Sequence, residues 1–88
     1  MKKLILNDGT ELENAEALLS SGTLFLYLGK AVDFRQAFDL LINPEATQEI
    51  RYLEFDEEKT FSGYTDLTYI RKEDDGSINA GLKRGVVE

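Results

Sequence analysis

Cysteine, histidine and tryptophan are all absent from this 88-residue chain, and proline occurs once. Without cysteine the chain can form neither a disulfide nor a thiolate zinc site, a pattern that fits a reducing compartment. Without histidine it lacks the usual general base near neutral pH, so neither a Ser-His-Asp triad nor a Cys-His pair can be assembled. Its seven glycines form no phosphate-binding loop motif. We therefore expect no enzymatic activity, no cofactor and no bound metal.

Long apolar runs are also missing. The start of the chain, "MKKLIL", is basic and then apolar, but the run stops at Asn7. A secretory signal needs an apolar region of about 7–15 residues, and a membrane-spanning helix needs about 18. These lengths predict a soluble, cytoplasmic protein without membrane contact. The total length predicts a single domain over residues 1–88 with a thin core.

Basic charge is scarce. Ten Lys and Arg stand against 17 Asp and Glu, which gives a net charge of −7. Up to Pro44 there are six acids and four bases, and after it eleven acids and six bases, so the excess lies mainly in the second half. This balance disfavours direct binding to nucleic acid, which needs a basic footprint. It favours basic partner proteins, although solubility alone also explains an acidic surface.

Two Asp-Gly pairs lie between apolar or alternating segments, Asp8-Gly9 near the start and Asp75-Gly76 near the end. Such pairs predict hairpins, because glycine adopts the positive φ that tight turns require. Alternation predicts further strands over residues 23–28, 48–55 and 77–83. A strand over residues 60–72 is also predicted, with a possible bend at Gly63, where a missing side chain permits a bulge.

One helix is predicted, from an N-cap at Asp33 to a stop at Asn43-Pro44. The i, i+3, i+4, i+7 spacing indicates a buried stripe made of Phe34, Ala37, Phe38 and Leu41. Three strands, this helix and three further strands predict an α+β fold. We expect a curved antiparallel sheet or small open barrel of five to six strands with one helix.

The most uneven segment is "EFDEEKTFSGY", in which four of the first five residues are acidic while Phe55, Phe61 and Tyr64 are large aromatics. We expect a loop over residues 56–59, with Tyr64 as an exposed aromatic anchor for a partner. A second acidic group follows on the next hairpin, and the two merge into one patch only if the chain bends at Gly63. An ordinary solvated turn is the alternative. The candidate partner-binding residues are Glu54, Asp56, Glu57, Glu58, Tyr64, Glu73, Asp74 and Asp75.

The segments "MKKLILNDGTELENAE", "DFRQAFDLLINPEATQEI" and "TFSGYTDLTYIRKEDDGSINAGLKR" resemble small acidic proteins encoded by phages and prophages of Gram-positive bacteria. That resemblance implies one of two roles in the bacterial cytoplasm. The first is an inhibitor of the anti-CRISPR kind that docks on the basic, nucleic-acid-binding surface of a host defence nuclease, such as an RNA-guided nuclease. The alternative is a small structural or assembly component of a phage tail or baseplate.

Overall fold

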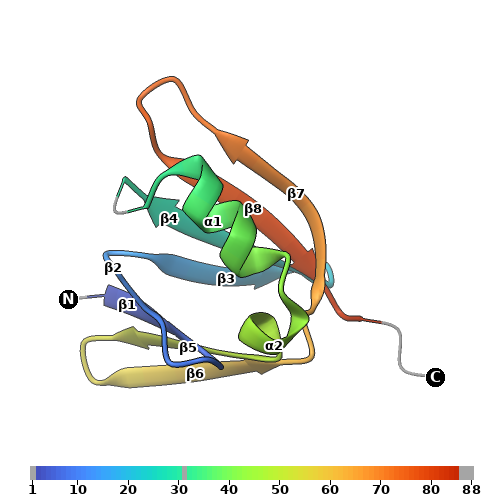
Figure 1. Ribbon diagram of the computed structural model, residues 1–88. Coiled ribbons are helices and arrows are strands. Elements are labelled where there is room, and N and C mark those ends of the chain that lie inside the picture. Colours follow the sequence, from blue (N-terminus) through green and yellow to red (C-terminus); the bar gives the residue numbers. More distant parts are fainter. Residues whose placement is uncertain (1, 31, 86–88) are drawn as a thin grey trace.

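The computed structural model describes residues 2–30 and 32–85, which form two four-stranded antiparallel sheets and two short helices (Figure 1). Sheet A has the order β2 (Glu11–Glu13), β1 (Lys2–Leu6), β5 (Glu49–Glu54), β6 (Glu57–Ser62). Sheet B has the order β3 (Glu16–Ser20), β4 (Thr23–Gly29), β8 (Ile78–Lys83), β7 (Asp66–Lys72). The helices α1 (Phe34–Leu41) and α2 (Pro44–Thr47) connect β4 to β5.

The α+β class agrees with the sequence, but the number and grouping of the elements differ. The structure describes eight strands in two sheets instead of five to six in one curved sheet or open barrel. Strand β3 and helix α2 were not predicted, and the strand predicted over residues 60–72 is two strands in different sheets.

Gly63 is the corner at which the chain leaves sheet A for sheet B. It has a φ of +83°, its N–H donates to the carbonyl of Gln48 at 2.8 Å, and its carbonyl accepts from Gly85 at 3.0 Å. A residue with a side chain would be strained at this φ, so glycine suits the corner. The predicted bend therefore exists, and it breaks the strand.

Both Asp-Gly hairpins are confirmed. Gly9 and Gly76 each have a φ of +93°, and β1 pairs with β2, and β7 with β8, as antiparallel neighbours. In each turn the aspartate side chain accepts from a backbone N–H two residues later, at 2.9 Å from Thr10 and from Ser77. These contacts close the turn from within, as expected for aspartate before glycine.

The core lies between the inner faces of the two sheets. On β4 and β8, every second side chain is fully or almost fully buried: Leu24, Leu26, Leu28, Ile78, Ala80 and Leu82. Sheet A contributes Leu4, Leu6, Leu12, Ile50 and Tyr52. The alternation predicted for β4 and β8 is therefore confirmed, because one face of each strand packs against the core. On β7 a bulge between Leu67 and Tyr69 breaks the simple alternation.

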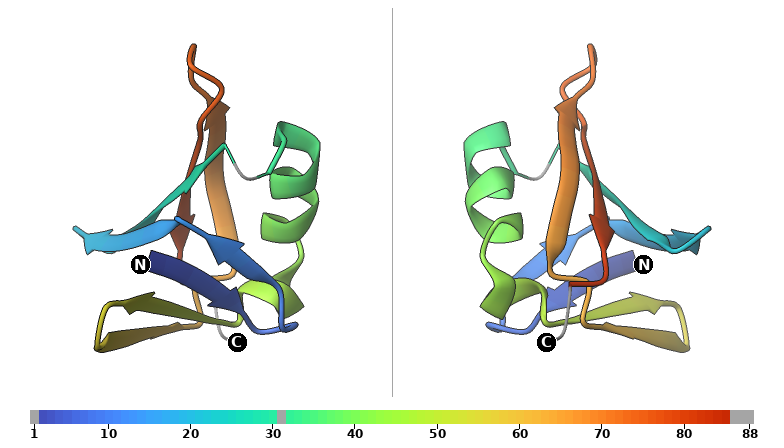
Figure 2. Two further views of the ribbon diagram at one scale, coloured as in Figure 1. Left: turned by 90° about the vertical axis from the view of Figure 1, so that its left-hand side faces the viewer. Right: turned by 90° about the vertical axis from the view of Figure 1, so that its right-hand side faces the viewer.

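Helix α1 begins and ends where predicted, but its buried face is narrower. Asp33 and Gln36 form a reciprocal capping box, and Ile42 is the C-cap. Ala37 and Leu41 are buried, whereas Phe34 and Phe38 are 40% and 36% exposed, so the prediction that both phenylalanines are core residues is wrong. Figure 2 shows why: α1 stands beside β7 at one end of the molecule, with much of its surface uncovered. In the described ranges, neither helix is long or apolar enough to cross a membrane.

Candidate protein-binding surface

The connection between β5 and β6 is a two-residue turn, Phe55-Asp56, closed by the opposed pair Glu54 and Glu57. The predicted loop over residues 56–59 is therefore wrong, because Glu57 to Lys59 already belong to β6. Phe55, the first residue of the turn, has a φ of +53°, in the region that favours glycine, whereas Asp56 does not have a positive φ. Glycine is the favoured residue at that first position, and a side chain there costs roughly 1–2 kcal/mol.

The Phe55 side chain is 82% exposed, the largest fraction among the exposed large apolar residues of the described chain. Together with Lys3, Leu53 and Asp56 it lines a shallow hollow of about 360 Å³. A large aromatic ring is thus held in water at a backbone position that disfavours any side chain. Neither burial nor turn chemistry explains why phenylalanine stands here.

The carboxylates around Phe55 differ in whether they already form ion pairs or hydrogen bonds with other side chains of this chain. Arg51 donates to Glu58 through Nε at 3.0 Å and Nη2 at 2.6 Å. The hydroxyl of Tyr52 donates to Glu54, and burial together with this carboxylate raises the pKa of the Tyr52 hydroxyl. Asp56 and Glu57 have neither an ion pair nor a side-chain hydrogen bond within the described residues. These two carboxylates are therefore the ones free to meet a partner.

We call Glu54, Phe55, Asp56, Glu57 and Glu58 the β5–β6 tip. It combines an exposed aromatic with a rim of acids, two of which are unpaired in the described structure. The acids of this tip are among the residues predicted from the sequence, whereas Phe55 is not. No signal in the pattern predicts this exposure, because alternation along β5 continues smoothly through Leu53 to Phe55 and the Phe-Asp turn lacks glycine and asparagine.

The second predicted acidic group, which we call the β7–β8 turn, consists of Glu73, Asp74 and Asp75. Asp75 accepts from the backbone N–H of Ser77 at 2.9 Å and from its hydroxyl at 2.7 Å, and these bonds lower the pKa of Asp75. Glu73 lies 2.9 Å from Arg71 Nε and accepts from Asn79 Nδ2 at 2.9 Å. Only Asp74 is without such a contact in the described chain, so most of this turn's charge serves its own hairpin.

The two acidic groups do not merge. Gly63 directs β7 into sheet B, and Figures 1 and 2 show the turn between β5 and β6 and the turn between β7 and β8 at opposite ends of the molecule. The structure therefore separates the predicted residues into two groups. Only the β5–β6 tip carries an aromatic residue at its centre.

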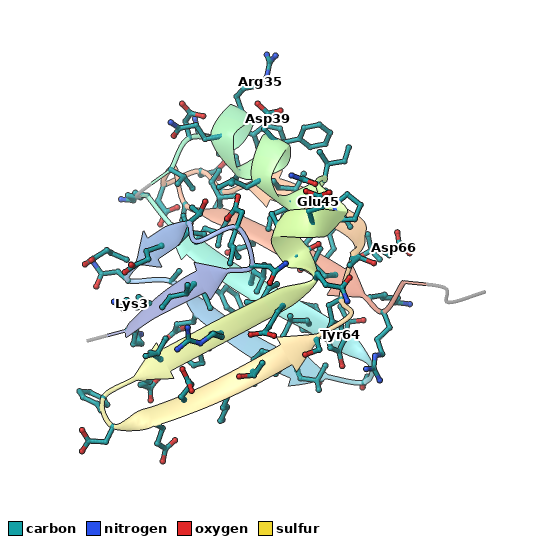
Figure 3. The ribbon with its side chains drawn as sticks, turned by 60° about the horizontal axis from the view of Figure 1, so that its bottom comes forward. Lys3, Arg35, Asp39, Glu45, Tyr64 and Asp66 are labelled. Atoms are coloured by element: carbon teal, nitrogen blue, oxygen red, sulfur yellow. The ribbon has the colours of Figure 1, made fainter. Side chains whose placement is uncertain are left out.

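Tyr64 is not an exposed anchor, and that prediction is wrong. It is 8% exposed, its ring lies edge-on to Phe61 with centroids 6.4 Å apart, and the Arg84 guanidinium lies 5.5 Å above it. Figure 3 shows Tyr64 at the end of β6, next to the corner at Gly63. These contacts make Tyr64 part of the packing that fixes the passage between the two sheets.

Three comparisons with known proteins find no relative: no family model, no curated protein and no solved structure matches this chain. Among residues 2–30 and 32–85, no three acidic side chains gather closely enough to hold a metal ion.

Proposed function

We propose that this chain is a non-catalytic binding module that docks its β5–β6 tip on a basic surface of a partner protein. The observation that carries this proposal is Phe55, an 82% exposed phenylalanine at a φ of +53°. Strained backbone positions concentrate at functional sites, where the strain presents a side chain in a fixed direction. Large aromatic residues inside a polar rim are also typical of protein–protein interfaces.

Electrostatics supports a basic partner. The net charge of −7 attracts a positively charged surface over a distance, and Asp56 and Glu57 at the tip are free to pair with its Lys and Arg side chains. The resemblance to phage-encoded proteins suggests one class of such partner, a host defence nuclease whose basic groove binds nucleic acid. In that role the tip would place carboxylates where phosphates bind, and Phe55 would fill an apolar pocket beside them.

A lysate pull-down from a Gram-positive bacterium, followed by a cleavage assay on the captured nuclease, tests this proposal. Wild type is compared with Phe55→Gly, which removes the ring and suits the turn, and with Ile42→Gly, which removes an exposed apolar side chain from the C-cap of α1. We expect wild type and Ile42→Gly to capture and inhibit the same nuclease, and Phe55→Gly to do neither. Equal capture by all three proteins would exclude the tip as the docking surface.

A second function, a structural or assembly component of a phage particle, is favoured by a different observation. Phe34, Phe38 and Ile42 follow one another at every fourth residue and form an exposed apolar ridge along α1. Contiguous exposed apolar surface is typical of faces that pack against a neighbour. If this function holds, Ile42→Gly loses incorporation into particles and Phe55→Gly does not, so the same pair of variants separates the two functions.

A further inference from the structure

Strand β3 is one of the four edge strands of the two sheets, and its end is apolar on both faces. Leu18 is 56% exposed and Leu19 is 44% exposed, although successive residues of a strand point to opposite faces. Figure 2 shows the β3–β4 hairpin projecting from the body of the molecule on the side away from α1. The projection leaves both leucines in water.

The other three edges carry the charges that natural proteins use to prevent edge-to-edge pairing. These charges are Glu11 and Glu13 on β2, Glu57, Glu58 and Lys59 on β6, and Asp66, Arg71 and Lys72 on β7. On β3 the one charged residue is Glu16, at the start of the strand, and it is paired with Lys2. Residues 17–20 therefore form the edge that lacks this protection, and we call them the β3 edge.

The backbone of the β3 edge is also open. The hairpin closes on the pair Ser20–Thr23 around the two-residue turn Ser21-Gly22. In an antiparallel ladder every second residue turns its N–H and C=O away from the partner strand, and in this register these residues are Ala17 and Leu19. Outside the helices and ladders, none of the backbone hydrogen bonds in the described chain involves residues 17–20. Strand β1 lies beside the start of β3, where Lys2 pairs with Glu16 and Asn14 donates to the Lys2 carbonyl at 2.8 Å.

We propose that the β3 edge pairs with the β3 edge of a second copy of this chain and joins two copies of sheet B into one eight-stranded sheet. A two-fold axis at Leu18 places Ala17 of each copy opposite Leu19 of the other, so that their outward N–H and C=O groups bond in both directions. Leu18 then meets Leu18 of the second copy at a non-hydrogen-bonded position, where side chains approach most closely. Glu16 faces Ser20, so no like charges are opposed.

Sheet B already contains the apolar row that this pairing would extend. Leu18 is registered with Phe25, Phe25 with Gly81, and Gly81 with Tyr69, so the row crosses all four strands on the outer face. A methyl group on Gly81 would lie 2.4 Å from Tyr69 Cε1, which shows that the Tyr69 ring covers this glycine. The rings of Phe25 and Tyr69 lie 6.5 Å apart. Pairing at Leu18 joins two such rows end to end and shields Leu18 and Leu19 from water.

This self-pairing uses sheet B, whereas Phe55, Asp56 and Glu57 of the β5–β6 tip belong to sheet A. Of the tip residues, Glu54 is the one that lines a hollow with Ala17 and Leu18 of the β3 edge. The two contacts respond to salt in opposite directions. Repulsion between two copies of charge −7 is screened as salt increases, so self-pairing strengthens, whereas docking on a basic partner weakens. Failure of one can thus be distinguished from failure of the other.

Sedimentation equilibrium from about 10 µM to about 1 mM protein tests the inference, since association depends on concentration. In about 0.5 M NaCl, where charge repulsion is screened, we expect wild type to approach twice the 10.0 kDa monomer mass. Leu18→Lys places like charges opposite each other at the axis and should raise the dissociation constant at least about tenfold. Leu19→Pro should do the same, because it removes an outward N–H without breaking the β3–β4 ladder.

The matched control is Ile42→Lys, which makes the same change of charge at an apolar residue that is 53% exposed on α1. We expect it to dimerise like wild type, and circular dichroism is used to check that every variant is folded. A wild type that stays monomeric throughout, or dimers that survive both β3 substitutions, would overturn the inference. So would loss of the dimer in Ile42→Lys alone, because the contact would then lie on the ridge of α1.

Discussion

The two acidic hairpin turns of this protein have similar compositions and opposite designs. At the β7–β8 turn the positive φ falls on Gly76, and the carboxylates of Glu73 and Asp75 bind groups of their own hairpin. At the β5–β6 tip the positive φ falls on Phe55, and the carboxylates of Asp56 and Glu57 make no ion pair and no side-chain hydrogen bond within the described chain. The first turn is arranged to stabilise the fold, whereas the second gives up stability to expose a side chain. A count of acids therefore does not distinguish the two turns, whereas the contacts that each carboxylate makes within the chain do.

The strongest test of this comparison is removal of the aromatic ring. Phe55→Ala should weaken binding to the captured partner about thirtyfold or more, the effect of losing a hot-spot side chain worth about 2 kcal/mol. The measurement is isothermal titration calorimetry with the purified partner. Asp74→Ala at the β7–β8 turn is the control and should bind like wild type. If both variants bind with wild-type affinity, the difference between the two turns has no functional meaning.

Substitutions at the two residues with positive φ, Gly76 and Phe55, should change the free energy of unfolding in opposite directions. Gly76→Ala forces a side chain into a φ of +93° and should lower the free energy of unfolding by about 1–2 kcal/mol. Phe55→Gly relieves strain and should raise that free energy by about 0.5–1 kcal/mol, after the greater freedom of glycine in the unfolded chain is subtracted. Urea denaturation followed by circular dichroism measures both. Destabilisation by Phe55→Gly would show that the ring stabilises the fold by packing on it, and is not simply exposed for a partner.

Charge reversal should distinguish the two turns by its effect on the rate of association with a partner. Asp56→Lys with Glu57→Lys should slow association with a basic partner about tenfold at low salt, with a smaller change in the dissociation rate. Asp74→Lys, at the other end of the molecule, should have a smaller effect, because it changes only the overall charge. Surface plasmon resonance at two salt concentrations separates the rates. Equal slowing by tip and control substitutions would attribute the effect to net charge alone.

The smallest expected effect concerns pH. The hydrogen bonds from Ser77 hold the pKa of Asp75 below its ordinary value of 3.8, so the folded state favours the ionised carboxylate. Its contribution to stability is therefore present above about pH 4 and is lost as the pH falls through the lowered pKa. The difference in melting temperature between wild type and Asp75→Ala should shrink over that range. A difference that persists at lower pH would mean that the side chain acts through packing.

Local signals in the sequence predicted the elements whose residues interact with near neighbours. Asp8-Gly9 and Asp75-Gly76 close hairpins, Asp33 caps α1, and alternation from Ile78 to Leu82 places β8 in the core. Strand β3 was missed because Leu18 and Leu19 are adjacent and both exposed, which hides the period of two. The burial of Phe34 and Phe38 was predicted wrongly because helical spacing indicates a face, but not how much of that face the rest of the fold covers.

The candidate surface was predicted only in part, for a related reason. The sequence identified the acids of the β5–β6 tip, because charge is visible without a structure. It could not show that Arg51 of β5 binds Glu58 of β6, since cross-strand partners depend on register. The bond from Tyr52 to Glu54 lies within β5, between residues two apart on the same face of the strand. Tyr64 was predicted to be the exposed aromatic anchor, whereas the aromatic that the structure exposes is Phe55. Whether Phe55 is exposed depends on whether the chain turns at Asp56 or further on. Whether Tyr64 is exposed depends on Arg84, a residue near the end of the sequence that packs on its ring.

The position of β8 has a consequence for how the protein is made. This strand lies inside sheet B, between β4 and β7, yet it follows β4 by about fifty residues in the sequence. At a synthesis rate of about 5–20 residues per second, the delay between synthesis of β4 and synthesis of β8 is on the order of several seconds. Until Lys83 leaves the ribosome, the edge of β4 that β8 will occupy is unpaired, and Leu24, Leu26 and Leu28 lack the apolar residues of β8 beside them. A nascent chain of this protein is therefore exposed to chaperones and proteases until its last described strand has been synthesised.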